Sequence, residues 1–179
     1  MPHTQHIIDD AGFDRMISRL SHEILERNHG SANVVIIGLR TRGEFVARRL
    51  AQRICEIEAG EIPLGVLDVT LYRDDVRTHL RQPEVHASSI PFDISGKDII
   101  LVDDVLFTGR TIRSALDALI DFGRPKTIQL AVAVDRGHRE LPIRADFTGK
   151  TIPTTRVQEV RVSLKEVDGQ DGIDLLTLE

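Results

Sequence analysis

The feature that most constrains the fold is a unit that recurs along the chain: a short apolar run, a polar turn and an amphipathic helix. In one unit the apolar run is 34–37 and the helical spacing extends over 45–57. In another the run is 99–102 and the helix covers about 110–122. Runs that are apolar at every position predict strands buried on both faces, which is typical of parallel sheets covered by helices. We therefore predict an α/β fold with an open, mostly parallel sheet and a ligand beyond the carboxyl ends of its strands.

The remaining segments extend this pattern over the 179 residues, a length that predicts one domain, 1–179. Apolar residues from Phe13 to about Asn28 predict a helix capped by Asp9 or Asp10. Residues 136–153 are punctuated by Gly and Pro, and 73–89 are charged and aperiodic, which predicts a long functional loop or hairpin. Further strands are predicted over 64–72, 127–134, 157–164 and 173–178.

Composition excludes several classes of protein. With 23 Lys and Arg against 28 Asp and Glu, the net charge is −5, so the chain is not globally basic, although a local basic patch remains open. Cys55 is the single cysteine, and no Cys/His cluster has zinc spacing, so we expect a reducing, cytoplasmic location. No window approaches ~18 apolar residues and the first residues lack a signal-peptide pattern, so we expect no membrane association.

The strongest chemical signal is the segment 101–111, LVDDVLFTGRT. Its apolar strand delivers Asp103 and Asp104, and a turn at Thr108 and Gly109 then opens a helix. A helix N-terminus offers unpaired N–H groups to a phosphate, and carboxylates accept hydrogen bonds from a ribose diol. The segment therefore predicts a ribose 5-phosphate site. The alternative is a capping Asp at an ordinary strand-to-helix turn.

This segment lacks the spacing of a Walker loop, and GLRTRG in 38–43 lacks that of a dinucleotide fingerprint. It resembles instead the phosphoribosyl-pyrophosphate motif of type I phosphoribosyltransferases. Together with GLRTRGE, TLYRDD and VDRGHRELPIRADFTGK, it resembles the family of bifunctional pyrimidine operon regulators and uracil phosphoribosyltransferases over nearly the whole chain. The resemblance implies a type I phosphoribosyltransferase fold with a mobile hood loop at about 71–90. It also implies synthesis of UMP and pyrophosphate from uracil and 5-phosphoribosyl 1-pyrophosphate.

The resemblance assigns roles to three loops. Asp103 and Asp104 would bind the ribose hydroxyls. The 5-phosphate would lie on Val105, Leu106, Phe107, Thr108, Gly109, Arg110 and Thr111. The pyrophosphate loop would comprise Leu39, Arg40, Thr41, Arg42 and Gly43, and the hood would begin with Tyr72, Arg73, Asp74 and Asp75. Candidate catalytic residues are Asp103, Asp104, Arg40 and Arg73. Mg²⁺ is the expected cofactor, held by substrate and water without a dedicated set of metal ligands. Solvated surface loops are the alternative at 39–43 and 72–75.

Phe107 bears on the choice of base, because purine enzymes that resemble this chain carry an acid just before the Thr-Gly turn. An apolar ring cannot carry a proton, which favours a pyrimidine. Two alternatives stay open: Phe107 is a packing residue without influence on the base, or the chain is a phosphoribosyltransferase for a purine or other base without an RNA role.

The resemblance also implies that the chain, with UMP bound, binds a leader mRNA hairpin and promotes transcription attenuation of pyrimidine genes. The RNA-binding residues it indicates are Ser18, Arg19, His22, Arg136, Arg139 and Arg144. Such a basic set would supply affinity that falls with salt. The alternative is a solvated or inter-subunit face. A homo-oligomer, dimer or higher, is expected.

Overall fold

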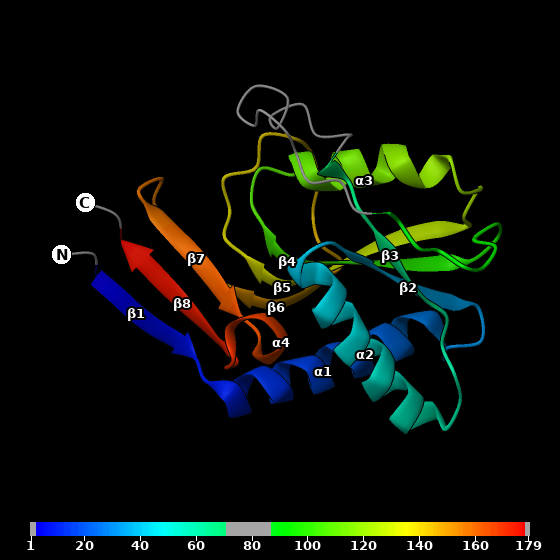
Figure 1. The fold of residues 1–179 in the computed structure, drawn as a ribbon, viewed down its shortest axis with the longest axis horizontal. Coiled ribbons are helices and arrows are strands. Elements are labelled where there is room, and N and C mark those ends of the chain that lie inside the picture. The colour runs from blue at the N-terminus through cyan, green and yellow to red at the C-terminus, as the bar shows by residue number, and fades with distance from the viewer. Residues whose placement is uncertain (1–2, 71–86, 178–179) are drawn as a thin grey trace.

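The computed structural model describes residues 3–70 and 87–177. Figure 1 shows the arrangement of its helices and strands. In chain order these are β1 His3–Ile8, α1 Asp10–Asn28, β2 Val34–Leu39, α2 Arg42–Glu58, β3 Leu64–Leu67, β4 Asp98–Leu106, α3 Arg110–Ile120, β5 Thr127–Asp135, β6 Phe147–Thr151, β7 Gln158–Ser163, α4 Lys165–Asp168 and β8 Gly172–Thr177.

The central sheet of the described chain has five parallel strands in the order β3-β2-β4-β5-β6. From β2 the chain moves outward to β3, whereas from β4 it moves through β5 to β6 in the opposite direction. The order therefore reverses between β2 and β4, and open α/β sheets bind ligands at such a switch point. The predicted fold class is confirmed, and the carboxyl ends of β2 and β4 are where a site is expected.

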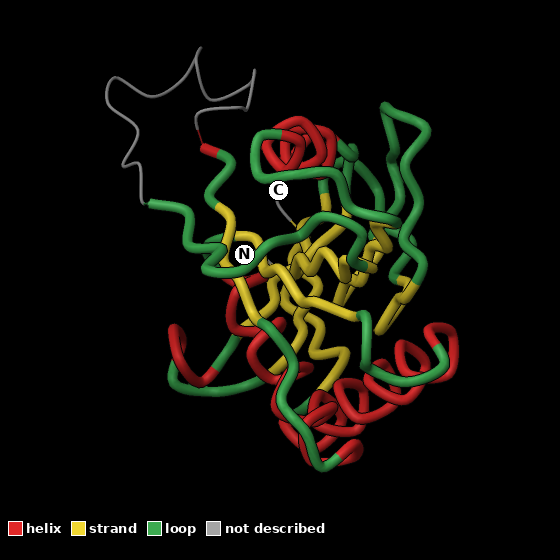
Figure 2. Tube along the Cα trace, turned by 90° about the vertical axis from the view of Figure 1, so that its right-hand side faces the viewer, coloured by secondary structure: helices red, strands yellow, loops and turns green. Residues whose placement is uncertain are grey.

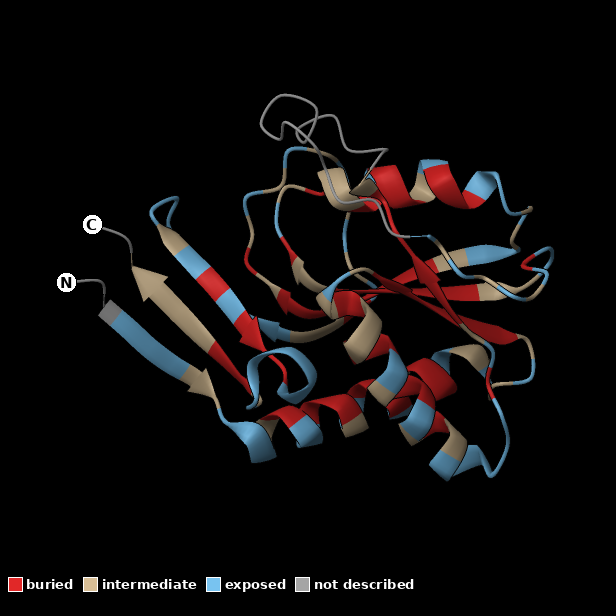
Figure 3. Cartoon of the chain, in the orientation of Figure 1, coloured by how far each residue is buried: buried red, intermediate tan, exposed pale blue. Residues whose placement is uncertain are grey.

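Alternate residues of the central strands face different helices. Val34 and Ile36 pack in the core that includes α1 and α2, whereas Val35 and Ile37 pack in the core that includes α3. Figures 1 and 2 both show helices on two opposite sides of the strands, and Figure 3 shows the inner strands as buried. Successive side chains of a strand point to opposite faces, so a strand between two helix layers must be apolar throughout. The continuous apolar runs 34–37 and 99–102 therefore predicted strands that lie between two layers of helices.

A second sheet of the described residues has three antiparallel strands in the order β1-β8-β7. Because β1 pairs with β8, the two ends of the chain lie side by side (Figure 1). Val162, Leu164 and Ile173 join this sheet to the core that includes α1 and α2. The second sheet therefore packs on the helix layer below the central sheet and reaches the carboxyl end of β2 from that side.

Two strands were missed by the sequence patterns. β1 reads HTQHII, in which Thr4, Gln5 and His6 are exposed, and among the described strands it pairs only with β8. β6, Phe147–Thr151, is an edge strand whose polar residues lie within the stretch that Gly and Pro punctuate. An edge strand of the described sheets has one partner strand and is partly exposed to solvent. Its sequence therefore needs neither a continuous apolar run nor a regular alternation of apolar and polar residues, the two patterns that indicate a strand.

Several predicted boundaries change. Asp9, of the two predicted caps, is the N-cap of α1, where its Oδ1 accepts from Gly12 N at 2.7 Å. Strand β3 ends at Leu67, short of the predicted 64–72, and α3 ends at Ile120. Residues 71–86, which include most of the predicted loop, lie outside the described residues. In the part of the chain that is described, no helix combines the length and apolar content needed to cross a membrane.

Candidate active site

The turn between β4 and α3 forms a site suited to an anion. Gly109 is the N-cap of α3 with φ 92°, a left-handed conformation that favours glycine, and the first turn of α3 contains no acidic residue. A cavity of about 310 Å³ opens here, lined by 105–112 together with Asp103 and Glu140. Because the first N–H groups of a helix lack partners within the helix and lie at the positive end of its dipole, this cavity is suited to a phosphate.

Asp103 and Asp104 lie within the last part of β4 rather than after it. Asp103 is buried and lines the cavity, and its Oδ1 accepts a hydrogen bond from Asp104 N at 2.9 Å. Asp104 is half-buried. Neighbouring residues of a strand point to opposite faces, so the pair presents carboxylates on both sides of the sheet edge. The strand therefore places the Asp103 carboxylate in the lining of the cavity and Asp104 next to it in the chain.

The start of α2 packs directly against this end of β4. A Cβ on Gly43 would lie 2.6 Å from the Val102 carbonyl oxygen and 3.0 Å from Asp103 Cα, distances that a side chain cannot occupy. The preceding turn joins Leu39 at the end of β2 to Arg42 at the start of α2, and its Arg40–Thr41 peptide bond is cis. Glycine at 43 thus lets the start of α2 approach the acidic end of β4.

Arg40 and Arg42, predicted together as pyrophosphate ligands, differ in their surroundings. Arg40 Nε is buried without a hydrogen-bond partner among the described residues, and its Nη2 lies 3.8 Å from Glu44. Arg42 instead donates from Nε to the Val162 carbonyl oxygen at 3.0 Å and from Nη2 to Asp168 at 2.9 Å. Arg40 therefore has an unused donor for an anion, whereas the Arg42 side chain ties the loop to the second sheet.

The ion pair of Arg42 also affects the titration of its partner. The backbone N–H of Leu164, followed by the side chain of Arg42, holds the pKa of Asp168 below its usual value. Both donors stabilise the ionised carboxylate, so the tie is fully formed at neutral pH.

The segment that follows β5 lies beside the phosphate turn. Arg136, predicted to contact RNA, is buried, with its guanidinium 4.0 Å from the centre of the Phe107 ring. It donates to the Gln158 carbonyl oxygen at 2.5 Å and to Thr154 Oγ1 at 3.3 Å, and its burial lowers the pKa of the guanidinium. The geometry thus corrects the prediction for Arg136: its guanidinium packs inside the chain.

The other predicted RNA-binding residues are distributed over α1 and the segment before β6. His22 and Arg144 are exposed and Ser18 is partly exposed. Arg19 Nη2 donates to the Gly149 carbonyl oxygen at 2.5 Å, which holds α1 against β6. Arg139, in the segment after β5, is paired with Asp135, the last residue of that strand. His22 and Arg144 therefore keep accessible side chains, whereas Arg19 and Arg139 are held by neighbouring groups.

Three acids near the strand ends were not predicted. Asp68 follows β3 and accepts from Thr70 Oγ1 at 2.6 Å, Asp135 ends β5, and Glu140 accepts from Arg110 Nε at 2.7 Å. Asp68 and Asp135 follow apolar runs, the same signal that identified Asp103. Tyr72, Arg73, Asp74 and Asp75 lie outside the described residues, so their predicted roles stay predictions.

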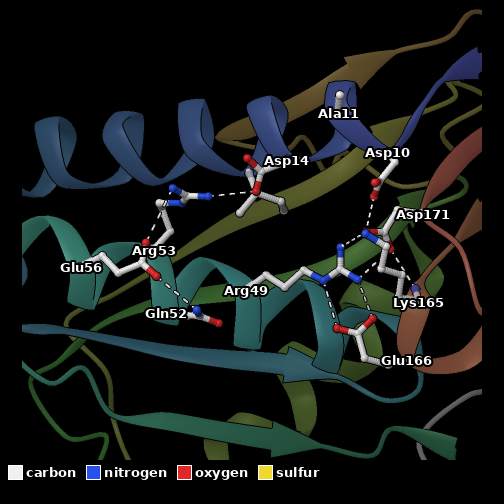
Figure 4. A pocket seen from close by; sticks show the side chains of 11 residues that line it. Asp10, Ala11, Asp14, Arg49, Gln52, Arg53, Glu56, Lys165, Glu166 and Asp171 are labelled. Atoms are coloured by element: carbon white, nitrogen blue, oxygen red, sulfur yellow. Dashed lines mark hydrogen bonds and ion pairs between the residues drawn. The ribbon is translucent and has the colours of Figure 1, made fainter.

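A larger hollow of about 720 Å³ lies between α1, α2 and α4, away from the phosphate turn. Figure 4 shows that its charged side chains point at one another: Arg49 meets Glu166 and Asp171, and Lys165 meets Asp10. These pairs satisfy each other and hold α4 against α2. We therefore assign the hollow to structure and the smaller cavity at α3 to ligand binding.

Comparison with known sequences agrees with this geometry. The family described as phosphoribosyl transferase domain matches residues 5–166, which include both loops of the site. The chain belongs to the phosphoribosyltransferase family. Its relatives include proteins named bifunctional protein PyrR from Pelotomaculum thermopropionicum, 55% identical over 95% of this chain and 94% of that one, and from Alkaliphilus metalliredigens, 56% identical over 94% and 93%. The resemblance that the sequence motifs indicated, to bifunctional pyrimidine regulators of the phosphoribosyltransferase family, is thus confirmed.

Solved structures of the family share the fold. The hypoxanthine phosphoribosyltransferase of Trypanosoma cruzi superposes with a TM-score of 0.74 at 16% identity, covering 98% of this chain and 97% of that one. That of Staphylococcus aureus gives 0.70 at 18% identity, covering 98% and 92%. At these identities the likeness establishes the type I phosphoribosyltransferase fold alone.

Proposed function

We propose that this chain transfers the phosphoribosyl group of 5-phosphoribosyl 1-pyrophosphate to uracil and, with the product UMP bound, binds a leader mRNA hairpin to regulate pyrimidine genes. One observation carries the enzymatic part. The open N-terminus of α3, the carboxylates of Asp103 and Asp104, and the unpaired Nε of Arg40 converge at the switch point of the sheet. The similarity of the chain to relatives named bifunctional protein PyrR supports the combination of an enzymatic and a regulatory role.

We propose one task for each loop. The 5-phosphate binds the N-terminal turn of α3, and the ribose hydroxyls donate to Asp103 and Asp104. The pyrophosphate lies along 39–43, where Arg40 donates to its oxygens. Uracil N1 then forms a bond to ribose C1 as the bond from C1 to pyrophosphate breaks, and N1 loses its proton. Holding both reactants in line and neutralising the leaving group supply the catalysis.

The donor set at β4 fits the magnesium ion that accompanies this substrate. Asp103 and Asp104 offer carboxylate oxygens, the ligands that Mg²⁺ prefers. When bound with the substrate, the ion would supply neutralising charge at the pyrophosphate. The two aspartates would hold the ribose and the ion at the end of β4.

Phe107 and its neighbours support a pyrimidine. The Phe107 side chain is covered by Arg136 at 4.0 Å, and the ring of His138 meets it edge-on at 6.0 Å. A neutral ring between two basic side chains provides neither the acid that meets a purine nor a proton carrier at that position. Uracil is the base we propose, and comparison with hypoxanthine as co-substrate separates it from the purine alternative.

The RNA surface we propose is centred on His22 and Arg144, with Ser18 and Arg19 beside His22 on α1. Exposed basic residues such as Arg144 would contact RNA phosphates, and unpaired loop bases would give sequence choice. Because the proposed target is a nascent transcript, the protein would act in the cytoplasm. The proposal includes a homo-oligomer.

One sample tests both roles. UMP formation is measured with uracil and with hypoxanthine, and binding of a pyrimidine-gene leader hairpin is titrated with and without UMP over a salt series. We expect turnover with uracil only, and RNA binding that UMP strengthens and salt weakens. Turnover with hypoxanthine would contradict the choice of base, and RNA affinity that ignores UMP would contradict the regulatory role.

A further inference from the structure

The segment 135–143 is joined to the phosphate turn by backbone hydrogen bonds. Arg136 N donates to the Leu106 carbonyl oxygen at 3.1 Å, and the N–H groups of Glu140 and Leu141 both donate to the Thr108 carbonyl oxygen, at 2.9 and 3.3 Å. The Arg110–Glu140 ion pair, 2.7 Å between Nε and Oε2, adds a side-chain link. The end of β4 and the segment after β5 therefore form one packed unit.

Arg139 lies at the centre of this unit. Its Nη2 donates to both carboxylate oxygens of Asp135, at 2.8 and 2.6 Å. Its Nη1 donates to the carbonyl oxygens of Phe107 at 2.6 Å and Gly137 at 3.4 Å, and its Nε donates to that of Ile143 at 2.9 Å. A guanidinium has five N–H donors, so these five bonds account for all of them.

This geometry differs from that of a side chain that reads RNA. The Arg139 side chain is 22% exposed and that of Asp135 is 17% exposed, and an arginine that contacts a phosphate needs free donors directed at solvent. Releasing Arg139 toward RNA would remove the donor that Asp135 Oδ2 and the Phe107 carbonyl oxygen share. Because a buried acceptor that loses its donor costs free energy, the loss of these internal hydrogen bonds opposes a contact between Arg139 and RNA.

We propose that Arg139 is a positioning residue of the nucleotide site, which fixes the segment after β5 against the phosphate turn and affects RNA binding only through that arrangement. The inference rests on the proposed function. Base and 5-phosphate belong to one nucleotide, so the groups on either side of it must keep a fixed spacing. The pair of Arg139 with Asp135 sets that spacing, because it joins the end of β5 to the carbonyl oxygen of Phe107.

Asp135→Asn distinguishes the two roles by the sign of its effect. If Arg139 contacted RNA phosphate, removing the neighbouring negative charge would strengthen RNA binding. If Arg139 is a positioning residue, the same change weakens RNA binding and UMP synthesis together, because the bidentate pair is lost. The asparagine can still accept the hydrogen bond that Gly137 N makes to Asp135 Oδ1 at 2.9 Å, so the local turn is retained.

The experiment compares the wild type with Arg139→Gln, Asp135→Asn and Arg144→Gln, and uses Arg124→Gln as the control. Arg124 is exposed and precedes the amino end of β5, whereas Asp135 is the last residue of that strand. For each folded variant, kcat/KM for uracil, the Kd for UMP and the slope of log RNA affinity against log salt are measured.

We expect Arg139→Gln and Asp135→Asn each to lower kcat/KM by roughly tenfold to a hundredfold. Both should weaken UMP and RNA binding with the salt slope unchanged. Arg144→Gln should lower that slope by about one unit, as expected for a lost phosphate contact. The Arg124 control should match the wild type in all three measurements.

Two results would overturn the inference: wild-type kcat/KM with a reduced salt slope in Arg139→Gln, or tighter RNA binding by Asp135→Asn. Because the second variant is nearly isosteric, it decides the question even if the first does not fold. A wild type that formed no UMP would contradict the proposed function itself, which is a separate result.

Discussion

Replacing Arg49 with methionine tests how the second sheet and α4 are held to the helix layer. Arg49 makes four hydrogen bonds: two to Glu166, at 2.6 and 3.0 Å, and two to Asp171, at 2.7 and 2.8 Å (Figure 4). Methionine retains an apolar stem but removes all four, together with the guanidinium, whose Cζ lies 5.4 Å from the centre of the Phe13 ring. The Asp171 side chain is 6% exposed and that of Glu166 is 36% exposed, so the two losses differ in size.

The magnitude follows from the burial of Asp171. Removing one partner of a buried ion pair costs about 3–5 kcal/mol, since the other charge is left uncompensated. Asp171 keeps the backbone N–H of Lys165 at 2.8 Å and its Nζ at 3.6 Å, which favours the lower end of that range. The exposed pair with Glu166 adds less than about 1 kcal/mol. We expect the free energy of unfolding to fall by about 3 kcal/mol at pH 7.

The pH dependence of this difference has a definite sign. Burial alone raises the pKa of Asp171, but hydrogen bonds from Arg49 and from the Lys165 backbone outweigh it and leave that pKa lowered; the hydrogen bond from Arg49 lowers the pKa of Glu166. A carboxyl with a lowered pKa in the folded state stabilises the protein above its unfolded pKa, and this contribution is lost as pH falls through the folded pKa. The difference between wild type and variant therefore narrows below about pH 4.

Urea unfolding at pH 7 and at successively lower pH measures this difference. The matched control is Arg48→Met, one residue earlier on α2, because Arg48 is 53% exposed and pairs with Glu44 on the same helix. Its expected cost is about 0.3–0.5 kcal/mol. The reasoning is refuted if the two variants are equally stable at pH 7, or if the deficit of Arg49→Met does not shrink at low pH.

Three further predictions concern the site. Asp104→Asn should fold normally and lose most UMP synthesis in a steady-state assay, because a neutral amide binds the ribose diol less well; wild-type turnover would exclude the ribose role. Gly43→Ala gains about 1 kcal/mol of helix propensity. Its Cβ would nevertheless lie 2.6 Å from the Val102 carbonyl oxygen, so we expect a net loss of about 2 kcal/mol in urea unfolding, and a stabilised variant would show that β4 can yield. Arg40→Gln should raise the KM for 5-phosphoribosyl 1-pyrophosphate by about tenfold at unchanged stability, whereas Arg42→Gln should lower stability by about 1–2 kcal/mol. The reverse pattern in these two arginines would contradict their assigned roles.

The sequence was most informative where the physical signal is local. Continuous apolar runs such as 34–37 and 99–102 indicate strands covered on both faces, and a Thr-Gly turn that opens a helix favours an anion site. These two patterns predicted the α/β class and a ligand site at the carboxyl ends of β2 and β4. Edge strands β1 and β6 carried no such signal, because one side of each strand is left without a partner strand in the described sheets.

The roles of the arginines were decided by the tertiary structure. In sequence, Arg40 and Arg42 are equivalent cations of one loop, and Arg136, Arg139 and Arg144 are equivalent cations of one segment. The fold gives Arg42 an acceptor 120 residues away at Val162 and buries Arg136 beneath Phe107, while Arg144 stays exposed. A long flexible cation binds whichever acceptor is nearest in space, and that acceptor is often remote along the chain. The sequence by itself therefore determined the α/β class and predicted a phosphate site at this turn, and only the packed fold decided which cationic side chains stay exposed and which bind other parts of the protein.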